Sequence, residues 1–244
     1  EISCSLVGSE MCIRDSTNTV WVGDVKYKDI SGPDGVPDGV IDDYDKTNIG
    51  SPMPKFTFGW TNTFRYKNFD LSVFINGSYG NKVYNYLSMK LTHMNSPWTN
   101  QLNAVNGRAQ LVPINPNKVY EDGTMWYNDV SNVMVANPGA SIPRATINDP
   151  NDNDRISDRY IEDGSYIRLK NISLGYTFPK KTIDKLGLSN LRIYANIQNL
   201  LTITGYDGYD PEIGASTSSV NVYGLDNGRY PSPTVYSFGL NVSF

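Results

Sequence analysis

The stretch TVYSFGLNVSF, residues 234–244, alternates apolar with small or polar side chains along its whole length. Successive residues of an extended strand point to opposite faces of a sheet, so one face of this stretch is almost wholly apolar. That face would carry Thr234, Tyr236, Phe238, Leu240, Val242 and Phe244. Strands of ~9–11 residues with one lipid-facing side build transmembrane β-barrels. The stretch favours such a strand, although a soluble sheet also alternates.

Other stretches repeat this alternation. Residues 56–66 and 69–79 are predicted strands, and Lys67–Asn68 is a two-residue hairpin turn between them. Residues 191–203 form another predicted strand, whereas residues 20–28 are a weaker candidate and residues 81–94 contain a possible short helix.

Residues 166–178 form a predicted strand whose phase changes along its length. Ile172 and Leu174 share one face, whereas Ile167 and Leu169 fall on the other. We therefore expect a bulge, or the boundary of the membrane, near Lys170 and Asn171.

The connections between these strands alternate between long and short. Residues 29–55, 80–165 and 204–233 are long, whereas residues 67–68 and 179–190 are shorter. Outer-membrane barrels have long extracellular loops and short periplasmic turns. The sequence therefore predicts an all-β fold made of five to six antiparallel strands of a large barrel, with its C-terminus in the periplasm.

Composition excludes some other classes of protein. The 244 residues are 39% hydrophobic and 12% aromatic, with 17 tyrosines, and no run of apolar residues is long enough for a transmembrane helix. The net charge of −4 gives no electrostatic reason to expect nucleic-acid binding. Both cysteines lie in residues 1–16, which resemble a translated sequencing adaptor, so we predict a non-native leader there and native chain over residues 17–244.

Several blocks together resemble one protein family. They are GDVKYKDI (23–30), DGVIDDYDKTNIGSPMPKFTFGW (38–60), YIEDGSYIRLKNISLGYTFPKK (160–181), LSNLRIYANIQNLLTITGYDGYDPE (188–212) and the terminal TVYSFGLNVSF. In this order they resemble the C-terminal part of SusC/RagA-like TonB-dependent outer-membrane transporters over residues 21–244.

The resemblance implies a barrel of about 22 strands, a plug and TonB-contacting segment outside this chain, and a SusD-like surface lipoprotein as partner. It also implies nutrient uptake through the outer membrane, with an oligosaccharide or a peptide as the solute. No catalytic residue is expected in such a segment. An alternative is a secreted calcium-dependent β-rich carbohydrate-binding module. A continuous apolar band across the strands would indicate the transporter, whereas a soluble module needs a polar outer surface.

The acidic stretch DGVPDGVIDDYD, residues 34–45, is similar to a twelve-residue EF-hand loop. Val36 occupies a position where Asp or Asn is expected, and the last position is Asp rather than Glu. A calcium site and a solvated acidic turn are both open at this point. The candidate calcium ligands are Asp34, Asp38, Val40 through its carbonyl, Asp42 and Asp45.

Aromatic residues of the long loops can stack on sugar rings or pack against a partner protein. This candidate set is Trp98, Trp126, Tyr127, Tyr206, Tyr209 and Tyr223. Phe244, the terminal aromatic residue, is a candidate assembly signal for insertion into the outer membrane.

The sequence offers little support for catalysis. His93 is the only histidine and has no Ser or Cys partner positioned by spacing, so we expect an ordinary loop residue. Residues 148–154 are acidic but lack a turn glycine, which favours a polar loop over a metal site. The carboxylates near Asp163 do not define the acid pair of a glycosidase, because sequence adjacency does not set their separation.

Overall fold

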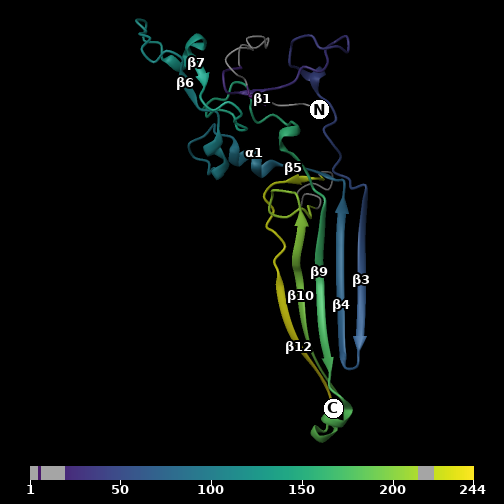
Figure 1. Ribbon diagram of the computed structural model, residues 1–244. Coiled ribbons are helices and arrows are strands. Elements are labelled where there is room, and N and C mark those ends of the chain that lie inside the picture. Colours follow the sequence, from purple (N-terminus) through teal and green to yellow (C-terminus); the bar gives the residue numbers. More distant parts are fainter. Residues whose placement is uncertain (1–4, 7–19, 214–222) are drawn as a thin grey trace. The chain divides into compact units, whose positions relative to one another are not determined.

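The computed structural model describes residues 5–6, 20–213 and 223–244, which divide between two compact units (Figure 1). The first unit comprises Glu1–Ile49 and Asn85–Ile161, and the second comprises Gly50–Tyr84 and Glu162–Phe244. Among the described residues, no helix is both long and apolar enough to span a membrane.

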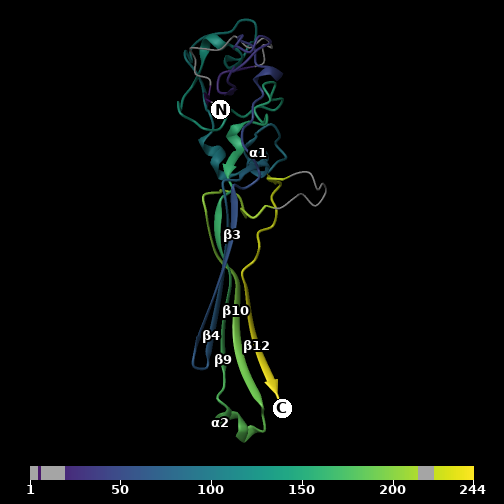
Figure 2. The same ribbon diagram turned by 90° about the vertical axis from the view of Figure 1, so that its right-hand side faces the viewer.

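The second unit is built on a five-stranded antiparallel sheet with the strand order β12-β10-β9-β4-β3 (Figures 1 and 2). The strands are β3 (Phe56–Tyr66), β4 (Phe69–Tyr79), β9 (Tyr166–Thr177), β10 (Asn190–Thr204) and β12 (Val235–Ser243). All five were predicted within one residue of these bounds. Lys67 adopts a φ of 53° between β3 and β4, which confirms the predicted hairpin turn.

The predicted bulge in β9 is also confirmed. Phe74 of β4 pairs with Asn171, but the next β4 residue, Ile75, pairs with Leu169, so Lys170 is the extra residue. The bulge resets the phase of the strand. Leu169 consequently shares a face with Ile172, and β9 stays apolar on one side along its length.

Two neighbouring rows of cross-strand partners show how the sheet separates its faces. One row, from β3 to β12, is Phe64, Leu71, Leu174, Ala195 and Phe238, and the adjacent row is Thr63, Ser72, Ser173, Asn196 and Ser237. Alternate rows point to opposite sides. In these rows the first side is apolar in every strand, and the second is polar or small.

The apolar side is exposed in this chain. Phe238 is 85% exposed and Trp60 is 55% exposed, although both belong to regular strands. A soluble protein rarely leaves so large an apolar patch in water. The face contradicts the alternative of a soluble carbohydrate-binding module and matches the lipid-facing wall of a transmembrane β-barrel.

The long connections all leave one end of the sheet, because β3 and β12 begin there, β4 and β10 end there and β9 begins there. At that end a small sheet has the order β11-β5-β8, from β11 (Leu225–Asp226), β5 (Lys82–Asn85) and β8 (Ile161–Asp163). The opposite end carries the β3–β4 turn, α2 (Lys180–Ile183) and η6 (Asp184–Leu186).

The first unit consists of short elements. They are β1 (Ser5–Leu6), β2 (Val25–Lys26), η1 (Asp43–Asp45), α1 (Tyr86–Thr92), η2 (Asn103–Gly107), β6 (Leu111–Pro113), η3 (Trp126–Asn128), η4 (Val130–Asn132), β7 (Val133–Val135) and η5 (Asp158–Tyr160). The strand predicted over residues 20–28 shrinks to β2, which pairs with β1. The helix predicted within residues 81–94 is α1, which β5 precedes.

Candidate functional site: the polar centre of the loop unit

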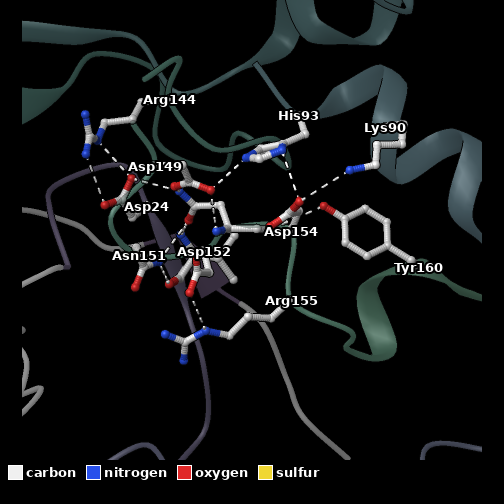
Figure 3. Close-up of polar contacts among 12 residues, drawn as sticks. Asp24, Lys90, His93, Arg144, Asp149, Asn151, Asp152, Asp154, Arg155 and Tyr160 are labelled. Atoms are coloured by element: carbon white, nitrogen blue, oxygen red, sulfur yellow. Dashed lines mark hydrogen bonds and ion pairs between the residues drawn. The ribbon is translucent and has the colours of Figure 1, made fainter. Parts of the chain in front are cut away.

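Buried polar side chains, rather than a large apolar core, join the segments of the first unit (Figure 3). Asn153 Oδ1 accepts the backbone N–H of Val25 at 2.7 Å, and Asn151 Nδ2 donates to the Val25 carbonyl at 3.0 Å. Asn153 Nδ2 also donates to Asp24 at 3.2 Å. These bonds bring residues 24–25 against residues 151–153, more than a hundred positions away in sequence. A polar network satisfied in this way fixes a unique geometry.

His93 lies between two carboxylates at the C-terminal end of α1 (Figure 3). Its Nε2 is 2.7 Å from Asp149 Oδ2, and its Nδ1 is 3.3 Å from Asp154 Oδ2. His93 and Asp149 are both more than nine-tenths buried. The prediction that His93 is an ordinary loop residue is therefore wrong, because the fold packs it against the acidic turn of residues 149–154.

The pKa values of two buried carboxyl groups in this network, Asp149 and Asp24, are shifted in opposite directions. Burial would raise the pKa of Asp149, but hydrogen bonds from His93 and from the Asn153 backbone outweigh it and hold the pKa below its usual value. Burial dominates at Asp24, where it raises the pKa despite the neighbouring Arg144 guanidinium. Arg144 Nε lies 2.8 Å from Asp24 Oδ1, so Asp24 anchors the arginine.

Arg144 also lines a pocket of about 580 Å³ in the first unit. Trp21 and Tyr127 supply aromatic walls, and Asn128 and Thr146 add polar atoms. Aromatic faces combined with a few polar groups suit a sugar ring or a peptide side chain. Only Tyr127 of this lining was among the predicted site residues. Sequence spacing does not show that Trp21 and Arg144, which come from other segments, lie in the same pocket.

Most of the predicted aromatic loop residues are accessible. Trp98 is 92% exposed, Tyr209 is 64% exposed and Tyr223 is 54% exposed. Trp126 packs edge-on against Tyr127, with ring centroids 5.7 Å apart. Trp98, Trp126 and Tyr127 belong to the first unit, and Tyr209 and Tyr223 to the second.

Tyr206 departs from the predicted aromatic set. Its side chain is only 5% exposed, and its hydroxyl donates to the Asp226 carboxylate. Burial and this hydrogen bond raise the pKa of Tyr206 above its usual value. The ring supports the loop from inside, so the structure removes Tyr206 from the residues that can contact a solute.

The acidic loop closes on a different aspartate from the one predicted. Asp29 Oδ2 accepts the backbone N–H of Gly39 at 2.6 Å, whereas Asp34 is exposed within the intervening turn. Asp45 is buried and accepts backbone N–H groups from Ile30 and Asp42 at 2.7 and 2.9 Å. The predicted register, with Asp34 as first ligand, stays a prediction; residues 32–38 form a turn here, and Asp29 rather than Asp34 contacts Gly39.

A second charged cluster fastens a long loop to the polar side of the sheet. Arg168 of β9 is 3% exposed and donates to Asp210 and, at 2.7 Å, to Glu212 Oε2. Lys170, the bulge residue, also reaches Glu212 Oε2 at 2.7 Å. Because Asp210 further accepts the Ser232 N–H at 2.9 Å, the cluster joins residues 210–212, residue 232 and the barrel wall.

The contacts of the His93 ring nitrogens are with two carboxylates, Asp149 and Asp154. Phe244 follows β12 and is 93% exposed. Its role as an assembly signal stays a prediction.

The fold and its apolar face define the chain as part of the wall of an outer-membrane β-barrel with structured loops. The solved structures support this class. The structure of the RagAB peptide transporter superposes on this chain with a TM-score of 0.66 and 18% sequence identity. The superposition covers 100% of this chain and 22% of the RagAB chain. The RagAB peptide importer in its open-open state gives a TM-score of 0.61. At this identity the likeness concerns the fold.

Sequence comparison supplies the family. No protein-family model matches the chain. TonB-dependent receptor P3 of Formosa agariphila is 36% identical over 84% of this chain and 18% of its own length. TonB-dependent receptor P26 of the same organism is 33% identical over 91% of the chain, and SusC of Bacteroides thetaiotaomicron is 29% identical over 84%. The chain thus belongs to the SusC/RagA-like TonB-dependent receptors, and it spans about a fifth of the length of these relatives.

Proposed function

We propose that the receptor containing this chain imports an oligosaccharide or a peptide across the outer membrane, together with a SusD-like surface lipoprotein and the TonB complex. The observation that carries the proposal is the continuous apolar face of the five-stranded sheet, which belongs in lipid. Family membership supports nutrient import, and one relative in fold is described as a peptide transporter.

In this proposal the chain supplies wall and loops and no catalytic group. The strand ends with long connections face the outside of the cell, and the short turns and the C-terminus face the periplasm, as the loop lengths of outer-membrane barrels require. TonB contacts a part of the receptor that lies outside this chain. The loops contribute the pocket of Trp21, Tyr127 and Arg144 and the exposed ring of Trp98 to the capture of the solute or the lipoprotein.

The test uses the full-length receptor in its native host. A double variant, Trp98→Ala with Tyr127→Ala, removes two accessible rings and is expected to slow growth on the imported solute several-fold or to reduce co-purification of the lipoprotein. Tyr66→Ala is the matched control, because this ring is 71% exposed but lies beside the short β3–β4 turn. Wild-type growth and wild-type co-purification in a correctly folded double variant would contradict the role of these loops.

A further inference from the structure

His93 is held in an arrangement that needs a cation. In a neutral imidazole one ring nitrogen donates and the other accepts, whereas an ionised carboxylate only accepts. Both nitrogens of His93 face carboxylate oxygens, Nε2 at 2.7 Å from Asp149 and Nδ1 at 3.3 Å from Asp154. Nε2–H can satisfy Asp149, but the Nδ1 lone pair would then point at another acceptor. Either a second proton or a metal ion has to lie between Nδ1 and Asp154.

The two distances favour a metal ion on the Nδ1 side. A charge-assisted N⁺–H···O⁻ bond is usually about 2.7–2.9 Å long, as between His93 and Asp149. The 3.3 Å between Nδ1 and Asp154 Oδ2 is longer than that. Two ligands bound about 2.0–2.1 Å from a tetrahedral Zn²⁺ lie roughly 3.3 Å apart. The gap therefore fits two ligands of one ion.

The surroundings complete the pattern of a metal-binding histidine. Such a histidine commonly donates its second N–H to a carboxylate, which fixes the tautomer and the ring orientation. Asp149 occupies that position and is itself held by the backbone N–H of Asn153 at 2.6 Å. His93, Asp149 and Asp154 offer ligand atoms that all lie within 4.8 Å of one another. Asp154 is 28% exposed, so water can fill the remaining coordination positions.

We propose that His93 Nδ1 and the Asp154 carboxylate bind a divalent transition-metal ion of the Zn²⁺ type, with Asp149 as the carboxylate that orients His93 (Figure 3). An imidazole ligand selects such an ion over Ca²⁺, which takes oxygen ligands. Lys90 approaches Asp154 only to 3.9 Å and is 46% exposed, so it can turn into solvent when the ion binds. The ion would join the end of α1 to the turn of residues 149–154.

The test measures Zn²⁺ binding to the full-length receptor, purified in detergent without a polyhistidine tag and stripped with a chelator. Calorimetry with Zn²⁺ alone, together with metal analysis, is expected to show one saturable ion in the wild type. His93→Gln and Asp154→Asn should each weaken binding by more than tenfold. Asp149→Asn should retain the ion with about 10–100-fold lower affinity, because only the orienting group changes.

Two further variants keep the result interpretable. Asp152→Asn removes the same charge from the same turn at a side chain that is 71% exposed, and should bind Zn²⁺ as the wild type does. Asp154→His exchanges one ligand for another and should retain the ion if Asp154→Asn merely misfolds. The proposal is overturned if the wild type binds no Zn²⁺ or if Asp154→Asn binds it equally well. It is also overturned if Zn²⁺ leaves the proteolysis of residues 149–154 unchanged. In any of these cases a protonated His93 would account for the geometry.

Discussion

At the scale of single residues, Arg168 is a charge with closely defined partners. It is almost fully buried, and its guanidinium satisfies Asp210, Glu212 and the Thr202 hydroxyl. The cluster therefore determines where the loop of residues 205–213 lies, since removing one partner leaves a buried charge without compensation. Lys170 shares Glu212 but is about a third exposed, which makes it the natural comparison.

We expect Arg168→Met to release this loop from the wall. Breaking a buried ion pair costs about 3–5 kcal/mol, so chymotrypsin should cleave after Tyr209 much faster than in the wild type. Lys170→Met, which removes a more exposed charge, should change cleavage little. Equal cleavage rates in the wild type and Arg168→Met would show that other contacts hold the loop.

The same cluster predicts a pH dependence. Burial would raise the pKa of Asp210, but hydrogen bonds from Ser232, Arg168 and Glu212 lower it below the usual value. The stabilisation is therefore fully present above the ordinary pKa of about 4, and it is lost as the pH falls through the lower folded value. Hydrogen exchange in residues 205–213, corrected for intrinsic rates, should rise as the pH is lowered from about 6 to about 3. Asp210→Asn should remove most of this pH dependence.

Calcium binding by the acidic loop remains a proposal, with Asp29 in place of Asp34. Asp29 Oδ1 is buried and lacks a hydrogen-bond partner among the described residues, whereas Asp34 is exposed. We expect Ca²⁺ at ~10⁻⁴–10⁻³ M, as in extracellular modules, to protect residues 29–45 of the full-length receptor from protease. Asp29→Asn should abolish the protection, and Asp34→Asn should preserve it. Protection that is identical with Ca²⁺ and with chelator would indicate a solvated acidic turn.

At the scale of the elements, β12 shows how one strand serves two environments. Phe238 belongs to the apolar row and Ser237 to the polar row, although they are neighbours in sequence. Phe238→Arg should destabilise the full-length barrel by about 2–4 kcal/mol, because it places a charge on the lipid side. Ser237→Arg puts the same charge on the lumen side and should be tolerated. Heat-modifiable migration of the folded barrel measures both, and equal effects would contradict the assignment of the faces.

The end of β12 predicts a role in assembly. Phe244 is 93% exposed, and its carbonyl accepts a hydrogen bond from Ser189 Oγ at 3.2 Å, so the ring is available while the backbone is held. Deleting Phe244, or replacing it by Asp, should lower the amount of folded full-length receptor in the outer membrane. Phe244→Trp keeps an aromatic ring and should restore it. An unchanged folded yield after deletion would contradict the assembly role.

At the scale of the whole molecule, β3 and β12 are the two edges of an open sheet. Backbone groups without partners cost several kcal/mol each in hydrocarbon, so a membrane barrel must close. Expressed alone, this chain should aggregate and give no heat-modifiable monomer in detergent, whereas the full-length receptor should. A monomeric, heat-modifiable product from the chain alone would show that these strands close without further ones.

The strands could be predicted from the amino-acid sequence, because period-two alternation is a local property that a chain carries into any sheet. The sequence also located the bulge, since Ile167 and Leu169 lie out of phase with Ile172, and the order of the blocks identified the family. It did not determine that the bulge returns Leu169 to the apolar face, because that depends on the register of β4 against β9.

The candidate sites, in contrast, became visible only in the folded chain. The sequence gives no measure of how close His93 comes to Asp149 and Asp154, 56 residues or more along the chain, or Asp24 to Asn153. Sequence spacing favoured Asp34 in the acidic loop, yet the backbone turn over residues 32–38 leaves Asp29 beside Gly39. Tyr206 likewise has an aromatic ring suited to solute binding, but the path of its loop buries it against Asp226. Such contacts depend on where distant segments meet, which local pattern does not encode.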